Sequence, residues 1–302
     1  MFDEAKMQRL AMIRYMNTMA IEQSSKPEPL YMTGLLLFHD AVELFVSLVS
    51  EHLNAGKTGQ DLMAYWDAIN QKLPSKDFAQ KDSMARLNKA RADWKHYGIR
   101  VSASQINDFR TNVADFFREN TPKVFGFSFE EISMAALVQS KEVRDRLLKA
   151  EQLHSKGDIK AALTETAIAF LNLLERFEWG IIDQSSFHLR DVSRRHFSPI
   201  ERAAPRELAR FAQEIEKELN GLHEQIKLLS LGVDYRNYMR FQQLTPYVAR
   251  MMDGSYHTAG EGYGQSSQDY LFCYHFVIEC ALRLQEVIQF PDPEVQWSGN
   301  IQ

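Results

Sequence analysis

Apolar residues recur at intervals of three and four positions along most of this chain, and this spacing constrains the fold more than any other feature. Over residues 31–54 the apolar positions are dense enough to predict a helix at the centre of a core. Glycine and proline, 14 and 9 of 302 residues, fall mostly between such stretches. We therefore predict an all-α protein. The predicted helices span residues 4–23, 31–54, 61–73, 78–97, 104–119, 128–155, 158–179, 205–231 and 268–290.

The chain is long enough for two domains that each bury a core. The segment NTPKVFGFSF, residues 120–129, contains Pro122 and Gly126, which argue against a helix and indicate a linker. We predict a helical bundle over residues 1–122 and a second helical domain over residues 128–302. The glycine-rich stretch 254–267 is predicted to be a mobile loop.

Charge and cysteine content narrow the class of protein. A net charge of −5 excludes a protein that coats polyanions over its whole surface, but it permits a local basic patch. The N-terminus begins acidic, and the apolar runs are too short to span a bilayer, so we expect neither a signal peptide nor a membrane partner. Cys273 and Cys280 fit neither a CxxC motif nor a disulfide framework, and with His275 and Glu279 they are expected in a core. We expect a cytoplasmic protein.

The stretch RLNKARADWKHYG, residues 86–98, is strongly basic within an acidic protein. Basic side chains suit phosphate groups and aromatic side chains suit base stacking, so the stretch predicts an RNA-binding surface. Within it Arg91 precedes His96 by five positions, and Gly98 is placed to end the helix in the left-handed conformation. The candidate RNA-binding residues are Arg86, Lys89, Trp94, Lys95 and Tyr97.

The spacing of Arg91 and His96 is weak by itself, because Arg190 with His196 and Arg250 with His257 also satisfy Arg-x4-6-His. Positions five apart on a helix diverge by about 140°. Arg91 and His96 therefore converge on one phosphate only if the helix loosens at its end or a second copy contributes.

The stretch LLLFHDAVELFVSLVSEHL, followed after an intervening helix by LNKARADWKHYG, resembles the HEPN superfamily of helical bundles over about the first 120 residues. In that family one helix carries a polar or acidic residue and a later one carries Arg-x4-6-His. The resemblance implies a metal-independent ribonuclease, often of bacterial toxin-antitoxin or phage-defence systems, that acts as a dimer with the motif at its interface. It makes Arg91 and His96 the catalytic pair and Glu43, or in second place Asp40, the supporting acid.

The implied chemistry needs no cofactor. A histidine can take the proton of an RNA 2′-hydroxyl, and an arginine can hold the scissile phosphate, which leaves a cyclic phosphate on the product. In this hypothesis the second domain controls or targets the nuclease.

Two other interpretations stay open. The family often has a polar residue after the arginine, where this chain has Ala92. This departure and the large second domain favour a non-catalytic sensor or scaffold that binds a partner protein or nucleic acid. Alternatively, Arg91 pairs with Glu43 in a satisfied core network, and the basic residues complement the dipole of a helix end.

The remaining motifs carry less information. His39, Asp40 and Glu43 share one side of a predicted helix, but no matching second ligand pair appears in the first half, so we expect no metal site.

The segment 190–210, with six arginines against three acids, is interpreted as a solvated turn rather than a phosphate-binding surface. The helix after it has an apolar stripe that suits packing within the domain or against a partner helix. Phosphate-binding glycine loops and a nucleophile elbow are missing from the sequence, which excludes ATP-driven, dinucleotide-dependent and α/β-hydrolase chemistry.

Overall fold

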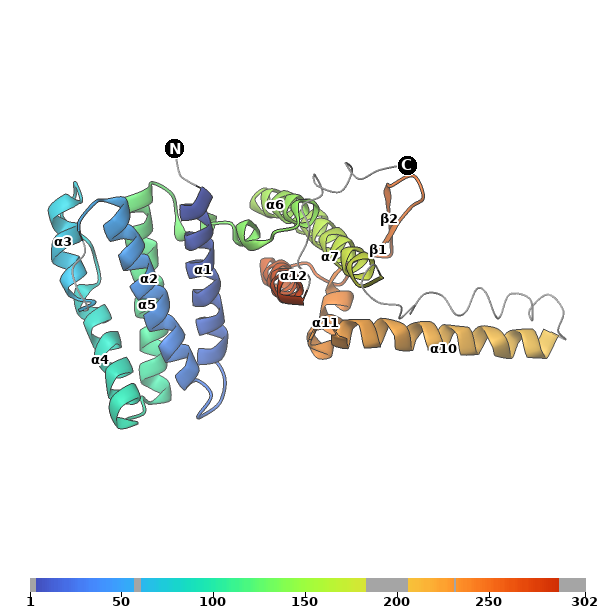
Figure 1. Cartoon of the computed structure of the whole chain (residues 1–302), viewed down its shortest axis with the longest axis horizontal. Coiled ribbons are helices and arrows are strands. Elements are labelled where there is room, and N and C mark those ends of the chain that lie inside the picture. The colour runs from blue at the N-terminus through green and yellow to red at the C-terminus, as the bar shows by residue number, and fades with distance from the viewer. Residues whose placement is uncertain (1–3, 57–60, 183–205, 231, 288–302) are drawn as a thin grey trace, which may run out of the picture. The chain divides into compact units, whose positions relative to one another are not determined.

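The computed structural model divides into two compact units, Met1–Leu137 and Val138–Gln302, called here the bundle and the C-terminal unit (Figure 1). The structure describes residues 4–56, 61–182, 206–230 and 232–287. Helices make up most of both units, and the strands among these residues form one small two-stranded sheet. The all-α prediction is confirmed.

Over its described residues, 4–56 and 61–137, the bundle consists of five helices and two short 3-10 turns. Their bounds are α1 Glu4–Ser24, α2 Met32–His52, α3 Ala64–Lys72, α4 Lys81–Tyr97, α5 Ala103–Phe125, η1 Phe129–Glu131 and η2 Met134–Leu137. Helix α4 begins three residues later than predicted, because the backbone N–H of Ala79 donates to Asn120 Oδ1 (2.8 Å) and Gln80 adopts a left-handed conformation. Helix α3 also begins late, after a turn in which Met63 N–H donates to the Asp61 carboxylate.

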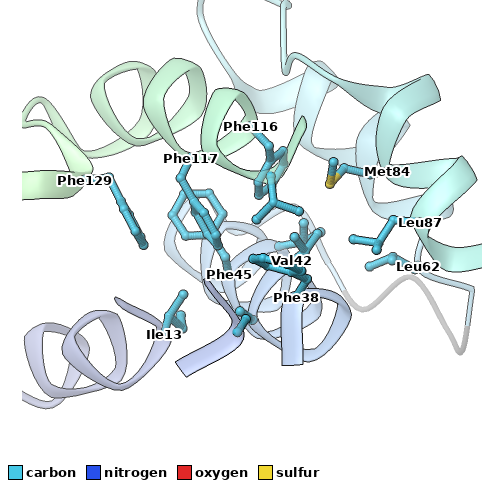
Figure 2. Packing of buried hydrophobic residues seen from close by; sticks show 14 of the residues in the cluster. Ile13, Phe38, Val42, Phe45, Leu62, Met84, Leu87, Phe116, Phe117 and Phe129 are labelled. Carbon is cyan, nitrogen blue, oxygen red and sulfur yellow. The ribbon is translucent and has the colours of Figure 1, made fainter. Parts of the chain in front are cut away.

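Helix α2 forms the centre of the bundle and packs against α1, α3, α4 and α5. Its Phe45 side chain is fully buried and makes edge-to-face contacts with Phe116 and Phe117 of α5, at centroid distances of 5.5 and 5.3 Å. Figure 2 shows these rings with Phe38 and Val42 of α2 below them. The apolar spacing over 31–54 therefore predicts the core element correctly.

The C-terminal part of α5 contradicts the predicted linker at residues 120–129. The helix does not end at Glu119 but continues through Pro122 to Phe125, and Gly126 ends it with a φ of 81°. Asn120 is fully buried, and its side-chain amide donates to the backbone oxygens of Phe116 and Ala79. Burial of this turn outweighs the hydrogen bond that proline removes. The contacts divide the chain after Leu137, beyond the boundary that the linker suggested.

Helix α2 is also long and apolar enough to cross a membrane by length and composition. Most of its apolar stretch is buried against the other helices of the bundle. The core helix of a soluble protein has these properties, so the structure is consistent with a soluble protein.

The C-terminal unit is built around α7, which packs against α6, α12 and the first strand. Its elements are α6 Lys141–Ser155, α7 Ile159–Ile182, α10 Arg206–Ser230, α11 Tyr235–Leu244, β1 Tyr247–Arg250, β2 Tyr256–Ala259 and α12 Ser267–Val287. The predicted helix from residue 128 is wrong in its first part, where η1 and η2 precede α6. The predicted loop 254–267 contains β2, which pairs antiparallel with β1. A Cβ on Gly262 would lie 2.4 Å from the Leu244 carbonyl oxygen, so this backbone packs directly against the end of α11.

Candidate functional site

The end of α4 keeps regular helical geometry as far as Tyr97. Gly98, at a φ of 68°, donates its N–H to Trp94 O (3.0 Å), and Ile99 N–H donates to Asp93 O (3.3 Å). The Gly98 bond is that of an αL cap, which confirms the predicted role of Gly98. Because the helix does not loosen, Arg91 and His96 diverge by about 140° and lie about 7.5 Å apart along its axis. One copy of the chain does not bring the two side chains together.

Arg91 is held on the side of α4 that faces α2. Its side chain is half-buried, and its Nε is buried without a hydrogen-bond partner. Its positive charge, together with that of Lys95, acts on the Asp40 carboxylate of α2. Among the described residues, neither Asp40 nor Glu43 forms an ion pair with Arg91 within 4.0 Å, so the expected satisfied network of Arg91 with Glu43 is not found.

His39 connects the polar residues of α2 to α4. It is 3% exposed, its Nε2 lies 3.0 Å from Asn88 Oδ1, and its Nδ1 lies 3.4 Å from Asp40 Oδ1. Nδ1 is also 3.6 Å from Glu43 Oε2. We call His39, Asp40, Glu43, Asn88 and Arg91 the α2/α4 polar cluster.

The electrostatics of this cluster keep Asp40 ionised. The hydrogen bond from His39 has the largest effect and lowers the pKa of Asp40. Burial has the second-largest effect and opposes it, and the charges of His39, Arg91 and Lys95 lower the pKa further. An ionised Asp40 attracts the Arg91 guanidinium through space, without an ion pair within 4.0 Å. Sequence reasoning preferred Glu43 as the supporting acid, and the charge of Arg91 also lowers the pKa of Asp40, the acid named in second place.

The predicted RNA-binding residues have different environments. Lys95, His96 and Tyr97 are exposed, Tyr97 by 76%. Trp94 is half-buried and packs against the apolar core, so Tyr97 is the aromatic ring that remains accessible.

The other basic residues of this surface have local partners. Arg86 donates to Ser83 Oγ, Lys89 pairs with Asp93 at 3.2 Å, and Arg100 pairs with Glu28 at 3.4 Å. Exposed pairs of this kind contribute little to stability, and their cations remain accessible to a phosphate. The accessible basic surface at the end of α4 therefore includes Arg86, Lys89 and Arg100 as well as Lys95 and His96.

A metal ion has a geometric candidate in the same cluster. One ligand atom from each of His39, Asp40 and Glu43 lies within 4.8 Å of the other two. The nearby charges of Arg91 and Lys95 already lower the pKa of Asp40, and they would repel a cation bound there. The positive charges oppose a metal ion in the cluster, and the carboxylates of Asp40 and Glu43 oppose an anion there.

Of the two other Arg-x4-6-His matches, the one that the structure describes does not form a comparable cluster. Arg250 and His257 lie on β1 and β2, and Arg250 pairs with Glu175 (2.9 Å) and with Glu142 (3.6 Å). Arg190, His196 and the rest of residues 190–205 lie outside the described residues.

The cysteine region of α12 is part of a core, as predicted. Cys273 and Cys280 are buried free thiols, and burial raises the pKa of Cys273 to about 12. The pKa of Cys280 is raised for the same reason. Neutral, buried thiols are poor metal ligands and nucleophiles.

Sequence reasoning missed two members of the cluster. His39 was considered only as a metal ligand, and Asn88 was not considered. Asn88 lies three positions before Arg91 and therefore shares its face of α4, and this spacing was the available indication.

Comparison of the chain with protein-family models, with curated proteins and with solved structures finds no match. The function must be argued from the residues themselves.

Proposed function

We propose that the protein is a HEPN-like, metal-independent endoribonuclease that cuts RNA as a homodimer in the cytoplasm. The observation that carries the proposal is the position of Arg91. Its side chain is half-buried near an ionised Asp40, and its Nε has no hydrogen-bond partner. It lies on the same helix as the exposed His96 and Lys95. The exposed part of the Arg91 side chain, on the same helix as accessible cations, suits a phosphate of RNA, whereas its Nε is buried out of reach of one.

In the proposed reaction, the imidazole of His96 takes the proton of a ribose 2′-hydroxyl. The 2′-oxygen attacks phosphorus, the bond from phosphorus to the 5′-oxygen breaks, and an imidazolium returns a proton to that oxygen. The products carry a 2′,3′-cyclic phosphate and a 5′-hydroxyl. Arg91 stabilises the charge that builds on the phosphate, and Asp40 keeps the guanidinium in place.

The divergence of Arg91 and His96 favours a site shared by two copies. Since α4 stays regular to its cap, Arg91 of one copy would meet His96 of the other across a twofold axis. Arg86, Lys89, Lys95 and Tyr97 would hold the RNA on either side. The C-terminal unit would control or target cleavage, as in a toxin or a phage-defence effector.

The test is RNA cleavage in EDTA by the full chain, by His96→Ala and by His257→Ala. The matched control removes an exposed histidine outside the bundle that also satisfies Arg-x4-6-His. We expect cleavage with cyclic phosphate ends by the wild type and by His257→Ala, and at least about a 100-fold loss in His96→Ala. Equal cleavage by all three proteins, or none by the wild type, would remove the nuclease proposal.

The second candidate is a non-catalytic scaffold that binds a partner protein or nucleic acid. The packing of Trp94 into the core and the hydrogen bond of His39 to Asn88 favour it, since both are structural links between helices. It predicts that Arg91→Ala and His96→Ala retain biological function and recover the same partner in a pull-down. Loss of function in both variants, with an intact fold, counts against the scaffold.

A further inference from the structure

Helix α10 carries an apolar stripe whose residues are spaced alternately by four and three positions. The mean interval of 3.5 is the heptad repeat of a left-handed coiled coil rather than the 3.6 of a helix that packs on a globular core. The α10 stripe consists of Leu208, Ala212, Ile215, Leu219, Leu222, Ile226 and Leu229. It extends over three heptads of a 25-residue helix (Figure 1).

Much of this stripe is exposed in the single chain. Leu208, Leu222 and Ile226 are each about half exposed, and Leu229 is 62% exposed. Among the described elements, α11 is the principal neighbour of α10, at its C-terminal end. Large apolar side chains in one row on a helix, left in water, indicate a surface that another helix covers.

A second α10 fits this surface in residue type. In heptad notation the a positions are Ala212, Leu219 and Ile226, and leucine occupies three of the four d positions. Leucine at d is typical of two-stranded coiled coils, and among the a positions Ile226 is the β-branched residue that favours two strands. In a parallel pair Glu218, at a g position, lies beside position 223 of the other copy and not beside its own equivalent, so it introduces no repulsion with itself.

The length of α10 also suits a dimer. A helix of 25 residues is about 37 Å long, and half the surface of a cylinder of that length and ~10 Å diameter is about 600 Å². Two copies would bury about 1,200 Å² in total, which reaches the lower limit of stable protein interfaces. The area available on α10 is therefore about that of a small stable interface.

We propose that α10 pairs with α10 of a second copy as a parallel, two-stranded coiled coil through the α10 stripe. This inference goes beyond the nuclease proposal and does not depend on it. If both hold, the coiled coil supplies the second copy that a site shared between Arg91 and His96 requires.

Sedimentation velocity of the full chain, from low to high micromolar concentration, tests the pairing. The variant Leu222→Lys places a charge on the stripe, and the matched control Gln213→Lys places the same charge at an exposed position off it. We expect a dimer for the wild type and for Gln213→Lys, with dimerisation weakened about tenfold or more in Leu222→Lys at unchanged helix content. A monomeric wild type, whose stripe would then be covered by its own chain or by another protein, overturns the proposal. So does a Leu222→Lys variant that dimerises like the wild type.

Disulfide trapping tests the orientation. Leu222→Cys places a thiol at a d position, where identical residues of a parallel pair meet, whereas Lys217→Cys places one on the outer face. The native thiols of Cys273 and Cys280 are buried and should not interfere. We expect a covalent dimer of Leu222→Cys alone, and cross-linking of Lys217→Cys alone would overturn the parallel register. RNA cleavage is scored separately, so a chain that pairs through α10 but does not cut RNA removes only the nuclease.

Discussion

Replacing Phe45 by alanine should unfold the bundle far more readily than replacing its neighbour Leu44. Phe45 is fully buried, and its ring lies 5.5, 5.3 and 5.8 Å from the centroids of three phenylalanines of α5. Truncation of a buried phenylalanine costs about 3–5 kcal/mol. Because edge-to-face pairs add to the cost of lost area, we expect about 4–5 kcal/mol. Leu44, on the outer face of α2, is 44% exposed, and its truncation should cost less than about 1 kcal/mol.

Urea unfolding followed by tryptophan fluorescence measures this difference. Trp66 is fully buried in the bundle and 5.8 Å from the Phe116 ring, so its emission reports on this core. With a slope of about 2 kcal/mol per molar urea, Phe45→Ala should lower the midpoint of the bundle transition by about 2 M. A loss of less than about 1.5 kcal/mol, or equal losses in Phe45→Ala and Leu44→Ala, would refute the placement of α2 at the centre of the core.

Three further predictions concern single groups. The pKa of Asp40 is lowered from its ordinary 3.8, chiefly by the hydrogen bond from His39, so its carboxylate stabilises the fold above pH 3.8 and this contribution is lost as the pH falls through the lowered value. In Asp40→Asn the free energy of unfolding should therefore change less with pH below 3.8 than in the wild type, as measured by urea unfolding at several pH values. An unchanged dependence on pH would contradict this. Gly98→Ala should cost about 1 kcal/mol of bundle stability in the same assay, because φ is 68° while a Cβ there meets no atom within 4 Å; no loss would contradict the cap. Cys273 and Cys280 should resist a thiol reagent at pH 8 in the native protein and react after denaturation, and rapid native labelling would contradict their burial.

Local patterns predicted the helices well and their ends less well. The apolar spacing of α2 and Gly98 at the end of α4 depend on neighbours in sequence, and both were read correctly. The extension of α5 through Pro122 depends on a distant contact, the buried Asn120 side chain against the backbone of Ala79. A local sequence pattern does not contain contacts between residues far apart in the chain. The proline was therefore interpreted as the end of the helix.

The small sheet was missed for a similar reason. Its strands have four residues each, and a close approach of Gly262 to Leu244 places the following segment against α11. Neither strand has an apolar alternation long enough to be recognised.

The candidate site was predictable in its residue types but not in its pairings. Helical spacing placed His39, Asp40 and Glu43 on one side of α2, yet it did not show which residues of α4 they face. The structure assigns the effect of Arg91 to Asp40 and buries His39 against Asn88. The angle between two helices decides such pairings, and the sequence of either helix alone does not contain it.

The central claim is that Arg91 of one copy and His96 of another form one catalytic site, and mixing two inactive variants tests it most directly. Arg91→Ala and His96→Ala are mixed after mild unfolding and refolding together, and RNA cleavage is compared with that of each variant alone. Half of the randomly formed dimers are mixed and have one intact site of two, so we predict about a quarter of the wild-type activity. Mixed dimers that form but stay as inactive as either variant alone, beside an active wild type, would contradict the shared site.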